Sequence, residues 1–381
     1  MTVQEKIKLV IILNDLDVGG AQRVIYELTK NIDFEKYNLT IICTDGKTNS
    51  LLENAMLNDS ISKYSIIFLK KILIKSRFTI FNKIFNKLFR FFFDIYSISQ
   101  IYNHLKKIKP EIIHANQNGI WAAWWALFNK VPVLTTIHSA PESTNTRLTE
   151  RIILHLSFVK KYNTLVAISK YNYTLVKNFW NYEKICWINN GINIDAFYNK
   201  PHEVFSFINV SRHDNNKNQI MIINAFYRLY TENPDFPMIL YLIGGGPTHD
   251  VLVRKVDEYK LNDKIIFTGN IESPNEYYSI SDVYLSSSHR EGLSLSALEA
   301  LASGLPIIST AVGGMIELTK ENGILIEDND ENGLFLAMKE LRDNSELRIA
   351  KSKESIKIIG EYSSSKMTEQ YCCLYDTLSL K

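Results

Sequence analysis

Two glutamates eight positions apart, Glu291 and Glu299, mark the part of this sequence whose residue types could do chemistry. Glu291 lies in a polar loop that follows an apolar run, and Glu299 lies at the start of an expected helix. A second apolar run, Pro306 to Thr310, comes next and ends before the pair Gly313 and Gly314. Carboxylates accept hydrogen bonds from hydroxyl groups, and a helix N-terminus with nearby glycines favours phosphate. This stretch therefore predicts a site for a ligand that carries hydroxyls and phosphates.

Each glutamate also has a structural interpretation. Ser296 and Glu299 match a capping box, in which the serine caps the helix and the glutamate reaches back to the serine amide. A glutamate in the first helical turn can equally accept two hydrogen bonds from a ribose diol. Glu291 precedes the helix and has no capping role, so exposure to solvent is its structural alternative. Residue types and spacing leave these alternatives open.

Positive charge follows another apolar run, Phe205–Val210. Arg212 and Lys217 come after this expected strand, at the end of a parallel sheet where open α/β folds bind ligands. Arginine offers a planar fork and lysine a point charge, so the two side chains suit a diphosphate. Two unrelated surface cations are the structural alternative. Their position after a strand, among other loop signals, favours the binding interpretation.

The first expected strand leads into the segment Asn14–Gln22, which contains Gly19 and Gly20. These glycines would let the backbone approach a ligand, and the helix that follows would direct its N-terminus at an anion. Asp15 and Asp17 have the D-x-D spacing of some metal-binding transferases. They precede a glycine loop instead of standing in a metal-binding context, so we predict no metal site.

A histidine ends each of two other expected strands. His138 follows the run Val131–Ile137 and is the stronger candidate, whereas His114, at the end of another run, ranks below it. A lone histidine at such a place is more often structural than catalytic. No G-x-G-x-x-G opens the first strand–helix unit, and the GGGP at residues 244–247 lacks the spacing of a P-loop. Dinucleotide oxidoreductases are therefore disfavoured.

Short apolar runs alternate with amphipathic stretches along the chain, which is typical of parallel sheets covered by helices on both faces. We expect an α/β protein with two doubly wound, Rossmann-like domains at residues 1–196 and 204–360, followed by a terminal helical segment at 361–381. The expected strands are Ile7–Leu13, Leu39–Thr44, Ile112–Ala115, Val131–Ile137, Leu165–Ile168, Lys184–Ile188, Phe205–Val210, Met238–Ile243, Ile265–Thr268, Val283–Ser287 and Pro306–Ser309. The expected helices include Ala21–Asn31, Asn218–Thr231, Gly333–Arg342 and a last one at about Ile356–Leu378.

Composition bounds the remaining classes of function. The chain has 381 residues, a net charge of +2, 46% hydrophobic and 22% charged residues, as in a soluble globular protein. So small a charge excludes a strong polyanion binder, and no nucleic-acid partner is expected. The four cysteines form no zinc pattern and predict free thiols in a reducing cytoplasm. Without a targeting segment or an apolar run of about 18 residues, a cytoplasmic location is expected.

One basic segment, residues 60–93, departs from the alternation. It contains no Asp or Glu but eight Lys or Arg, and its apolar residues between positions 81 and 92 recur with helical spacing. A basic amphipathic helix rich in phenylalanine can lie at a membrane interface with its cations on anionic headgroups. A core-facing helix with a solvated basic face is the alternative. A membrane surface that meets residues 68–93 is therefore an expected partner, with peripheral association at the inner face of the cytoplasmic membrane.

The chain resembles the retaining glycosyltransferases of family 4, which have the GT-B fold. The strongest match is EGLSLSALEALASGLPII at residues 291–308, which carries the E-x7-E signature. SRHDNNKN at 211–218 is similar to the family's G-R-L-x-x-x-K-G, and INNGINIDAF at 188–197 to its P-N-G-V-D segment, with Asn189 and Asn193 in place of the usual Pro and Asp. VGGAQRVIYEL at 18–28, KPEIIHAN at 109–116 and TTIHS at 135–139 match the family's first domain. The resemblance thus covers nearly the whole chain.

This resemblance implies a role for each matched residue. Arg212 and Lys217 would bind the diphosphate of the donor, Glu299 its ribose, and Glu291 the hydroxyls of the transferred sugar. His138 would lie near the reacting carbon. The remaining implied donor-binding residues are Gly19 and Gly20 in a loop that closes over the site, and Gly292, Ser294 and Leu295 at the helix start. The resemblance also implies two domains that face each other across a cleft, and a C-terminal helix that crosses back to the first domain.

The implied reaction is sugar transfer from a nucleotide-sugar, a UDP-sugar in most of the family, with retention at the anomeric carbon and without a metal or other cofactor. A hexosyl or N-acetylhexosaminyl group would pass to a lipid-linked or growing saccharide acceptor in bacterial surface polysaccharide synthesis: capsule, O-antigen or lipopolysaccharide. Two alternatives stay open. A nucleotide-sugar 2-epimerase shares the architecture and would change the donor without an acceptor, and a non-catalytic nucleotide-sugar-binding subunit would bind without turnover.

Overall fold

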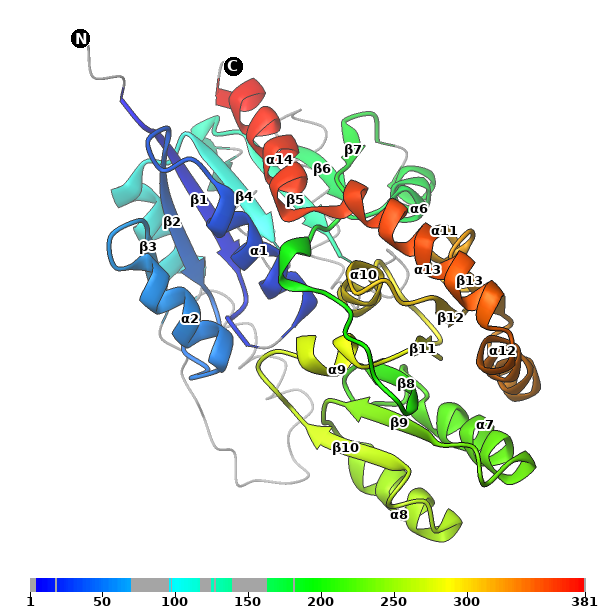
Figure 1. Cartoon of the computed structure of the whole chain (residues 1–381). Helices are drawn as coiled ribbons and strands as arrows, with labels where there is room; N and C mark the ends of the chain where they lie inside the picture. The colour runs from blue at the N-terminus through cyan, green and yellow to red at the C-terminus, as the bar shows by residue number, and fades with distance from the viewer. Residues whose placement is uncertain are drawn as a thin grey trace. The chain divides into compact units, whose positions relative to one another are not determined.

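The structure of the chain is a computed structural model that describes residues 5–17, 19–69, 96, 98–116, 125, 126, 128–138, 163–180 and 182–379. It divides into two compact units (Figure 1). The first comprises Met1–Ile168, Tyr173–Ile188 and Thr368–Lys381, and the second comprises Ser169–Asn172 and Asn189–Met367. In the part of the chain that the structure describes, each unit contains one sheet, and every strand pairing within the two sheets is parallel. The α/β class and the two Rossmann-like domains are therefore confirmed.

Within the described residues, the sheet of the first unit has seven strands in the order β3-β2-β1-β4-β5-β6-β7. The strand order reverses direction between β1 and β4, which is the switch point where doubly wound folds bind ligands. The strands of this sheet are β1 (Ile7–Leu13), β2 (Tyr37–Cys43), β3 (Ser65–Phe68), β4 (Ile112–Asn116), β5 (Val133–Ile137), β6 (Asn163–Ala167) and β7 (Ile185–Trp187). Helices α1 (Gly20–Asn31), α2 (Leu51–Ser60) and α6 (Lys170–Trp180) belong to the same half of the chain.

The sheet of the second unit has six strands in the order β10-β9-β8-β11-β12-β13, and its switch point lies between β8 and β11. The strands are β8 (Phe205–Val210), β9 (Met238–Ile243), β10 (Ile265–Gly269), β11 (Val283–Ser286), β12 (Ile307–Thr310) and β13 (Gly323–Ile326). The helices are α7 (Gln219–Glu232), α8 (His249–Tyr259), α9 (Asn275–Ser279), α10 (Leu295–Ala302), α11 (Met315–Thr319), α12 (Glu331–Asp343) and α13 (Ser345–Ile359). Residues that follow β8 and β11 must therefore meet at one edge of this sheet.

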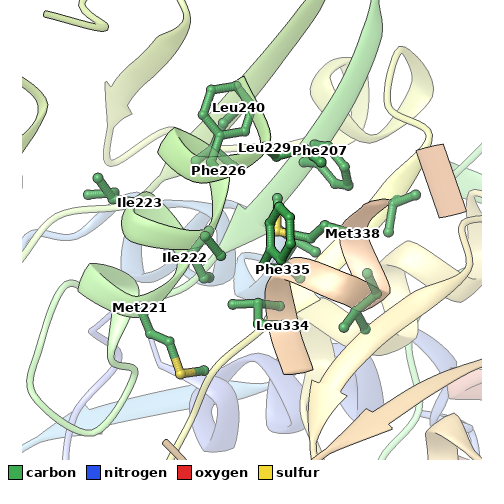
Figure 2. Packing of buried hydrophobic residues seen from close by; sticks show 14 of the residues in the cluster. Phe207, Met221, Ile222, Ile223, Phe226, Leu229, Leu240, Leu334, Phe335 and Met338 are labelled. Atoms are coloured by element: carbon green, nitrogen blue, oxygen red, sulfur yellow. The ribbon is translucent and has the colours of Figure 1, made fainter. Parts of the chain in front are cut away.

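Two amphipathic helices, α7 and α12, pack against each other and share one buried apolar cluster with residues of the sheet (Figure 2). Phe207 on β8 meets Phe226 on α7 edge-to-face, with ring centroids 6.3 Å apart, and both side chains are fully buried. Met338 on α12 is also wholly buried in this cluster. Burying a side chain of this size stabilises the fold by roughly 1.5–3 kcal/mol. This core fixes the end of β8 from which Arg212 and Lys217 extend.

The C-terminal region contains two helices where we expected one at about Ile356–Leu378. Helix α13 ends at Ile359, a short 3-10 turn covers Gly360–Tyr362, and α14 runs from Ser364 to Ser379. The break occurs because Ser363 is extended (φ −73°, ψ 144°) and pairs with Ile192 as an isolated parallel bridge. The amide of Ser364 also donates to the Ile192 carbonyl at 2.8 Å. Tertiary pairing therefore interrupts a segment whose local sequence favours a continuous helix.

Helix α14 returns to the sheet of the first unit, as the fold class predicted. Its Tyr375 hydroxyl lies 2.7 Å from Nδ1 of His114 on β4, and Asp376 accepts a 2.5 Å hydrogen bond from the Tyr37 hydroxyl on β2. The bridge described above holds residues 189–192 and 361–363 together, so the division between the units falls at Asn189 and Thr368. We had expected boundaries at residues 196–204 and 361.

The basic segment at residues 60–93 is described only in part. Its first ten residues contain the end of α2 and the strand β3, and residues 70–93, with the expected helical spacing, lie outside the described residues. Within the described ranges, no helix combines the length and apolar character needed to cross a membrane.

Candidate functional site

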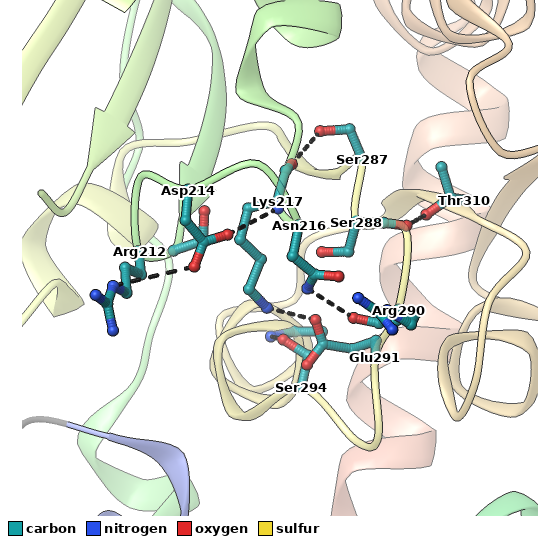
Figure 3. A network of polar contacts seen from close by, with 12 residues as sticks. Arg212, Asp214, Asn216, Lys217, Ser287, Ser288, Arg290, Glu291, Ser294 and Thr310 are labelled. Atoms are coloured by element: carbon teal, nitrogen blue, oxygen red, sulfur yellow. Dashed lines mark hydrogen bonds and ion pairs between the residues drawn. The ribbon is translucent and has the colours of Figure 1, made fainter. Parts of the chain in front are cut away.

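Hydrogen bonds tie together the two loops that follow β8 and β11 in the second unit (Figure 3). Ser287 Oγ donates to the carbonyls of Lys217 (2.7 Å) and Asn218 (2.9 Å). The Asn216 carbonyl accepts from the amide of His289 at 2.8 Å, and its side-chain amide donates to the Arg290 carbonyl at 3.0 Å. These bonds link residues about 70 positions apart in sequence. They fix the cationic loop of residues 211–218 against the loop that carries Glu291.

The structure brings Lys217 and Glu291 into direct contact. Lys217 Nζ lies 2.5 Å from Glu291 Oε2, and the two side chains are only 22% and 14% exposed. Asp214 Oδ1 accepts from the Lys217 backbone amide at 3.1 Å, which holds the turn before the lysine. An ammonium and a carboxylate thus stand together at the switch point of the sheet. Such a pair can meet a phosphate through the cation and a hydroxyl through the carboxylate.

Arg212 is not joined to this pair. Its side chain is 72% exposed, its Nε lies 4.0 Å from Asp214 Oδ2, and it points away from Lys217 (Figure 3). An exposed guanidinium held so loosely keeps most of its donors for a ligand. The loop therefore offers two cations of different kinds, one half-buried and paired, the other extended into solvent.

Glycines after β9 let the backbone pack tightly against the cationic loop. A Cβ on Gly244 would lie 2.2 Å from the Ser211 carbonyl oxygen, and one on Gly246 would lie 2.4 Å from that of His213. Both glycines have positive φ angles, 128° and 153°. The amide of His213 donates to the Gly245 carbonyl at 2.9 Å, which joins the two loops directly. The GGGP sequence thus supports the backbone on which Arg212 stands.

Another glycine pair, Gly313 and Gly314, packs against the backbone of the loop that carries Glu291. A Cβ on Gly313, whose φ is 56°, would lie 1.6 Å from the Glu291 carbonyl oxygen. A Cβ on Gly314 would lie 2.1 Å from the Gly292 carbonyl oxygen, which accepts the Gly314 amide at 2.9 Å. No side chain fits at either position without moving the loop. These glycines therefore set the position of Glu291.

Helix α10 begins two residues earlier than the capping-box interpretation required. Its N-cap is Ser294, whose Oγ accepts from the amide of Ala297 at 3.3 Å, and Leu295 is the first helical residue. Glu299 therefore stands too far along the helix to reach back to the cap, so the expected box of Ser296 and Glu299 is wrong. The alternation of serines in SLSALE made either serine acceptable as a cap from the sequence.

Glu299 is fully buried beside two tyrosines that sequence reasoning missed. Its Oε2 accepts from the Tyr278 hydroxyl at 3.1 Å, and that hydroxyl also lies 2.8 Å from the Ser296 carbonyl. Tyr284 on β11 is also buried, and burial raises its pKa above the ordinary range, with Glu291 and Glu299 adding to the shift. A carboxylate so enclosed is held in one orientation. Tyr278 lies on the short helix α9, and no spacing in the sequence links it to Glu299.

A buried histidine, His213, follows Arg212 directly where the family pattern has leucine. Its ring stacks on His249, with centroids 5.3 Å apart, and the two Nδ1 atoms lie 3.1 Å apart. Phe267 packs edge-on against both rings. Burial, with a smaller contribution from His249, lowers the pKa of His213 to about 4. This histidine is therefore neutral at neutral pH and serves to pack the loop.

Gly19 and Gly20 belong to the first unit, at the start of α1. Gly20 is the first helical residue, and Gly19 is its N-cap with an extended φ of −149°. Asp15 Oδ1 accepts from the amide of Asp17 at 3.0 Å and from Gln22 Nε2 at 2.9 Å. Asp15 thus stabilises this turn. Among the described residues no group of three or more His, Cys, Asp or Glu is arranged to hold a metal ion.

His138, also in the first unit, follows β5 and contacts the end of β4. Its Nε2 lies 2.6 Å from Oδ1 of Asn116, and burial lowers its pKa to about 4. His114 differs, since both of its ring nitrogens contact the protein: Tyr375 at 2.7 Å and Thr136 at 2.7 Å. His114 is thereby a structural residue that docks α14, in keeping with its lower rank. Among the described residues, no group forms a hydrogen bond with the other ring nitrogen of His138.

A cavity of about 490 Å³ opens at the carboxyl ends of β1, β2 and β3 in the first unit. It combines two carboxylates, a lysine and an aromatic ring, and the Lys47 ammonium lies 5.3 Å from the centre of the Phe68 ring. Its lining consists of Asp15, Asp45, Gly46, Lys47, Thr48, Phe68 and Leu69. Hydroxyl-rich molecules suit such a lining, because carboxylates accept and ammonium groups donate hydrogen bonds.

The chain is similar in sequence to known proteins. N-acetyl-alpha-D-glucosaminyl L-malate synthase from Bacillus anthracis is 29% identical over 157 residues, which is 40% of this chain and 40% of that protein. UDP-Gal:alpha-D-GlcNAc-diphosphoundecaprenol alpha-1,3-galactosyltransferase from Escherichia coli is 26% identical over 306 residues, or 74% of this chain and 79% of that protein. The matches span about half the length, or less, of several other curated relatives.

A solved structure supports the same assignment of fold. HepE from Anabaena in complex with UDP superposes with a TM-score of 0.76 at 14% identity, over 98% of this chain and 100% of that one. The sequence profile described as Glycosyltransferase Family 4 matches residues 18–196, and the profile described as Glycosyl transferases group 1 matches residues 192–357. With almost its whole length covered, the chain has the GT-B fold and belongs to glycosyltransferase family 4.

Proposed function

We propose that this protein is a retaining, metal-independent glycosyltransferase that takes a hexosyl or N-acetylhexosaminyl group from a UDP-sugar. The observation that carries the proposal is the ion pair of Lys217 and Glu291 at one edge of the second sheet, with the exposed Arg212 on the same loop as Lys217. Two cations suit a diphosphate, and a carboxylate suits sugar hydroxyls. A transferase needs both in one place.

The chemistry follows from the leaving group. A nucleoside diphosphate leaves readily once its growing negative charge is stabilised. Arg212, Lys217 and the amides at the start of α10, near Ser294 and Leu295, supply fixed positive charge for that purpose. This stabilisation needs no metal ion, so the reaction is proposed to be metal-independent. Retention of configuration is proposed from membership of the family.

The other residues complete the proposed donor site. Buried Glu299 would hold the ribose diol, and Gly292 would let the backbone approach the donor. In the first unit, His138 is proposed to contact the transferred sugar near the reacting carbon. Gly19 and Gly20, at the start of α1, would let their loop adapt to the substrate.

The acceptor is proposed to be a lipid-linked or growing saccharide of a bacterial surface polysaccharide such as capsule, O-antigen or lipopolysaccharide. The name of the Escherichia coli relative, which contains diphosphoundecaprenol, supports a lipid-linked acceptor. The cavity bounded by Asp45, Lys47 and Phe68 is a candidate place for acceptor hydroxyls. An acceptor of this kind requires work at the membrane surface, in keeping with a protein at the inner face of the cytoplasmic membrane.

The basic sequence of residues 68–93 is proposed to provide that contact. Each Lys or Arg near an anionic leaflet contributes about 1 kcal/mol. Co-sedimentation with vesicles should therefore increase with anionic lipid content and fall when Lys70, Lys71, Lys75 and Arg77 are changed to glutamine. Binding that ignores both changes would refute the membrane proposal and leave the transferase proposal intact.

Thermal unfolding with nucleotides tests the transferase proposal directly. UDP at about 100 times its dissociation constant should stabilise the protein by roughly 2.7 kcal/mol. The stabilisation should disappear in Arg212→Ala and Glu299→Ala, whereas GDP, ADP and NAD should have little effect. Incubation with UDP-sugars and saccharide acceptors should then yield a glycoside. A sugar altered without any acceptor would indicate an epimerase, and nucleotide binding without turnover a non-catalytic subunit.

A further inference from the structure

Asn116, the last residue of β4, lies diagonally across from His138, the residue that follows the adjacent strand β5. In the parallel pairing of β4 with β5, Asn116 lies opposite Thr136, and His138 follows two residues later on the same face. The Asn116 side chain is 1% exposed, and its Oδ1 lies 2.6 Å from Nε2 of His138. The contact is therefore short and has one partner buried at the end of β4.

The chemistry of the contact determines the state of the ring. An amide oxygen can only accept a hydrogen bond, so Nε2 of His138 must carry the hydrogen. A neutral imidazole with hydrogen on Nε2 has its lone pair on Nδ1. Burial also lowers the pKa of His138 to about 4, so the neutral ring prevails at neutral pH. Among the described residues, Nδ1 of His138 has no hydrogen-bond partner.

His114 provides the contrast within the same strand pair. It makes the equivalent diagonal contact, from Nε2 to Thr136 Oγ1 at 2.7 Å, but its Nδ1 is also occupied, by the Tyr375 hydroxyl. Among the described residues, the groups that face these two rings are Asn116, Thr136 from β5, Tyr371 and Tyr375 from α14, and each histidine for the other. None of them is a carboxylate or a lysine. Asn116 is thus the group that selects the tautomer of His138.

We propose that Asn116 is a positioning residue, which locks His138 in its Nε2–H tautomer and so presents Nδ1 as a hydrogen-bond acceptor to a hydroxyl of the substrate. The contact with a substrate hydroxyl rests on the proposed transferase function, whereas the tautomer of His138 does not. A locked acceptor orients a hydroxyl-bearing ligand without needing to release or take up a proton. This property suits a sugar and does not suit a phosphate, which would require a donor.

Nuclear magnetic resonance of the full chain with ¹⁵N-labelled histidine tests the tautomer without any substrate. The chain has eight histidines, and His138→Gln assigns the signals of interest by their disappearance. The wild type should show protonated Nε2 and unprotonated Nδ1 between pH 6 and 8. Asn116→Leu, which keeps the size but removes the oxygen, should give a mixture of tautomers. Protonated Nδ1 in the wild type, or an unchanged spectrum in Asn116→Leu, would overturn the proposal.

Asn116→Asp is the second variant, for use even if the leucine variant does not fold. The carboxylate keeps an acceptor at the same place and adds a negative charge, so the pKa of His138 should rise by at least one unit. The His114 signals, which should be unchanged, report that the strand pair is intact. An unaltered titration of His138 in Asn116→Asp would contradict the contact itself.

Kinetics then separate the positioning role from the proposed function. With a UDP-sugar that supports turnover, Asn116→Leu should lower kcat about tenfold at unchanged KM, because one oriented hydrogen bond is lost. Asn116→Asp should move the acid limb of the pH profile to higher pH. If no UDP-sugar supports turnover while the tautomer result holds, the transferase proposal fails and the positioning role of Asn116 stands. If Asn116→Leu kept the kcat and KM of the wild type, the proposed orientation of a substrate hydroxyl by His138 would be refuted.

Discussion

Lys217 and Glu291, 74 positions apart in sequence, form a 2.5 Å ion pair at the switch point of the second sheet. Each side chain thereby neutralises the other, and both are largely shielded from solvent. A diphosphate that binds Lys217 must therefore compete with Glu291 or share the ammonium with it. The carboxylate can turn to a sugar hydroxyl once the phosphate takes the lysine. On the proposed function, the pair would couple recognition of the two halves of a nucleotide-sugar.

This coupling predicts opposite effects of Glu291→Gln on binding and on transfer. Removal of the carboxylate frees Lys217, so affinity for UDP should rise by roughly fivefold, the equivalent of about 1 kcal/mol for a partly exposed pair. Transfer should fall at least tenfold, because the contact with the sugar is weakened. Titration calorimetry with UDP and an assay of sugar transfer measure the two effects.

The matched control is Glu232→Gln, which breaks the 2.7 Å surface ion pair with Lys339. It removes the same charge and should leave both UDP affinity and transfer unchanged. Lys217→Met should weaken UDP binding, so that the two members of the pair act in opposite directions. Weaker UDP binding in Glu291→Gln would show that the carboxylate supports the lysine instead of competing with the phosphate.

A second prediction concerns the glycines that hold the Glu291 loop. Gly314→Ala keeps an allowed backbone angle (φ −67°) but places a methyl group 2.1 Å from the Gly292 carbonyl oxygen. The loop must move, which should destabilise the protein by about 2 kcal/mol and abolish the stabilisation by UDP. Gly360→Ala is the control, since no atom lies within 4 Å of the added Cβ and its φ is −56°. That variant should be neutral or stabilised by about 0.5 kcal/mol. Equal behaviour of the two alanines in thermal unfolding would refute the steric argument.

A third prediction follows from the buried His213. Its pKa is lowered from 6.5 to about 4, so the unfolded chain binds a proton at a higher pH than the folded one. The stability that this group contributes is complete above pH 6.5 and is lost as the pH falls from 6.5 towards 4. Between pH 7.5 and pH 5 the loss from one such group is about 2 kcal/mol. His114 and His138, with their pKa values lowered to about 3 and about 4, act in the same direction.

His213→Leu should remove one part of this acid sensitivity. Nε2 of His213 is buried without a hydrogen-bond partner among the described residues, so an apolar side chain should also stabilise the fold at pH 7.5, by about 1 kcal/mol. Urea unfolding of the wild type and the variant at pH 7.5 and pH 5 measures both effects. A stability difference that does not grow on acidification would mean that the ring is protonated in the folded state.

The sequence predicted those strands whose burial produces a continuous run of apolar residues. Strands buried on both faces read as continuous apolar runs, and Ile7–Leu13, Phe205–Val210 and Met238–Ile243 were predicted with the bounds that the structure has. The edge strands β3 and β13 were missed because they are only partly buried. Strands β11 and β12 have the same length of four residues but are buried throughout, and they were predicted. The single terminal helix was wrong because its interruption depends on pairing with Ile192, about 170 positions away.

The candidate site also has features that the sequence could predict and features that it could not. Strand ends are local features, so the sequence could indicate Arg212, Lys217 and Glu291 as neighbours of one sheet edge. Their partners are set by tertiary contacts: the sequence held no sign that Lys217 would pair with Glu291, or that Asn116 would meet His138. The cap of α10 was misplaced because two serines compete for it, and only the packing of the loop selects Ser294.

The environment of Glu299 leads to a final prediction, about the nucleotide itself. If this buried carboxylate holds a ribose diol, Glu299→Gln, which keeps the shape but lowers the strength of the acceptor, should weaken binding of UDP about tenfold. The same substitution should have little effect on binding of 2′-deoxy-UDP, which lacks one of the two hydroxyls.

Tyr278→Phe removes a hydroxyl that lies 3.1 Å from the carboxylate and should act in the same direction as Glu299→Gln, but less strongly. Calorimetry with the two nucleotides gives a double-mutant cycle between protein and ligand, in which the coupling energy belongs to the contact with the ribose. Equal losses for UDP and 2′-deoxy-UDP would mean that Glu299 only supports the fold of α10, and its burial beside Tyr278 and Tyr284 would then be a structural feature.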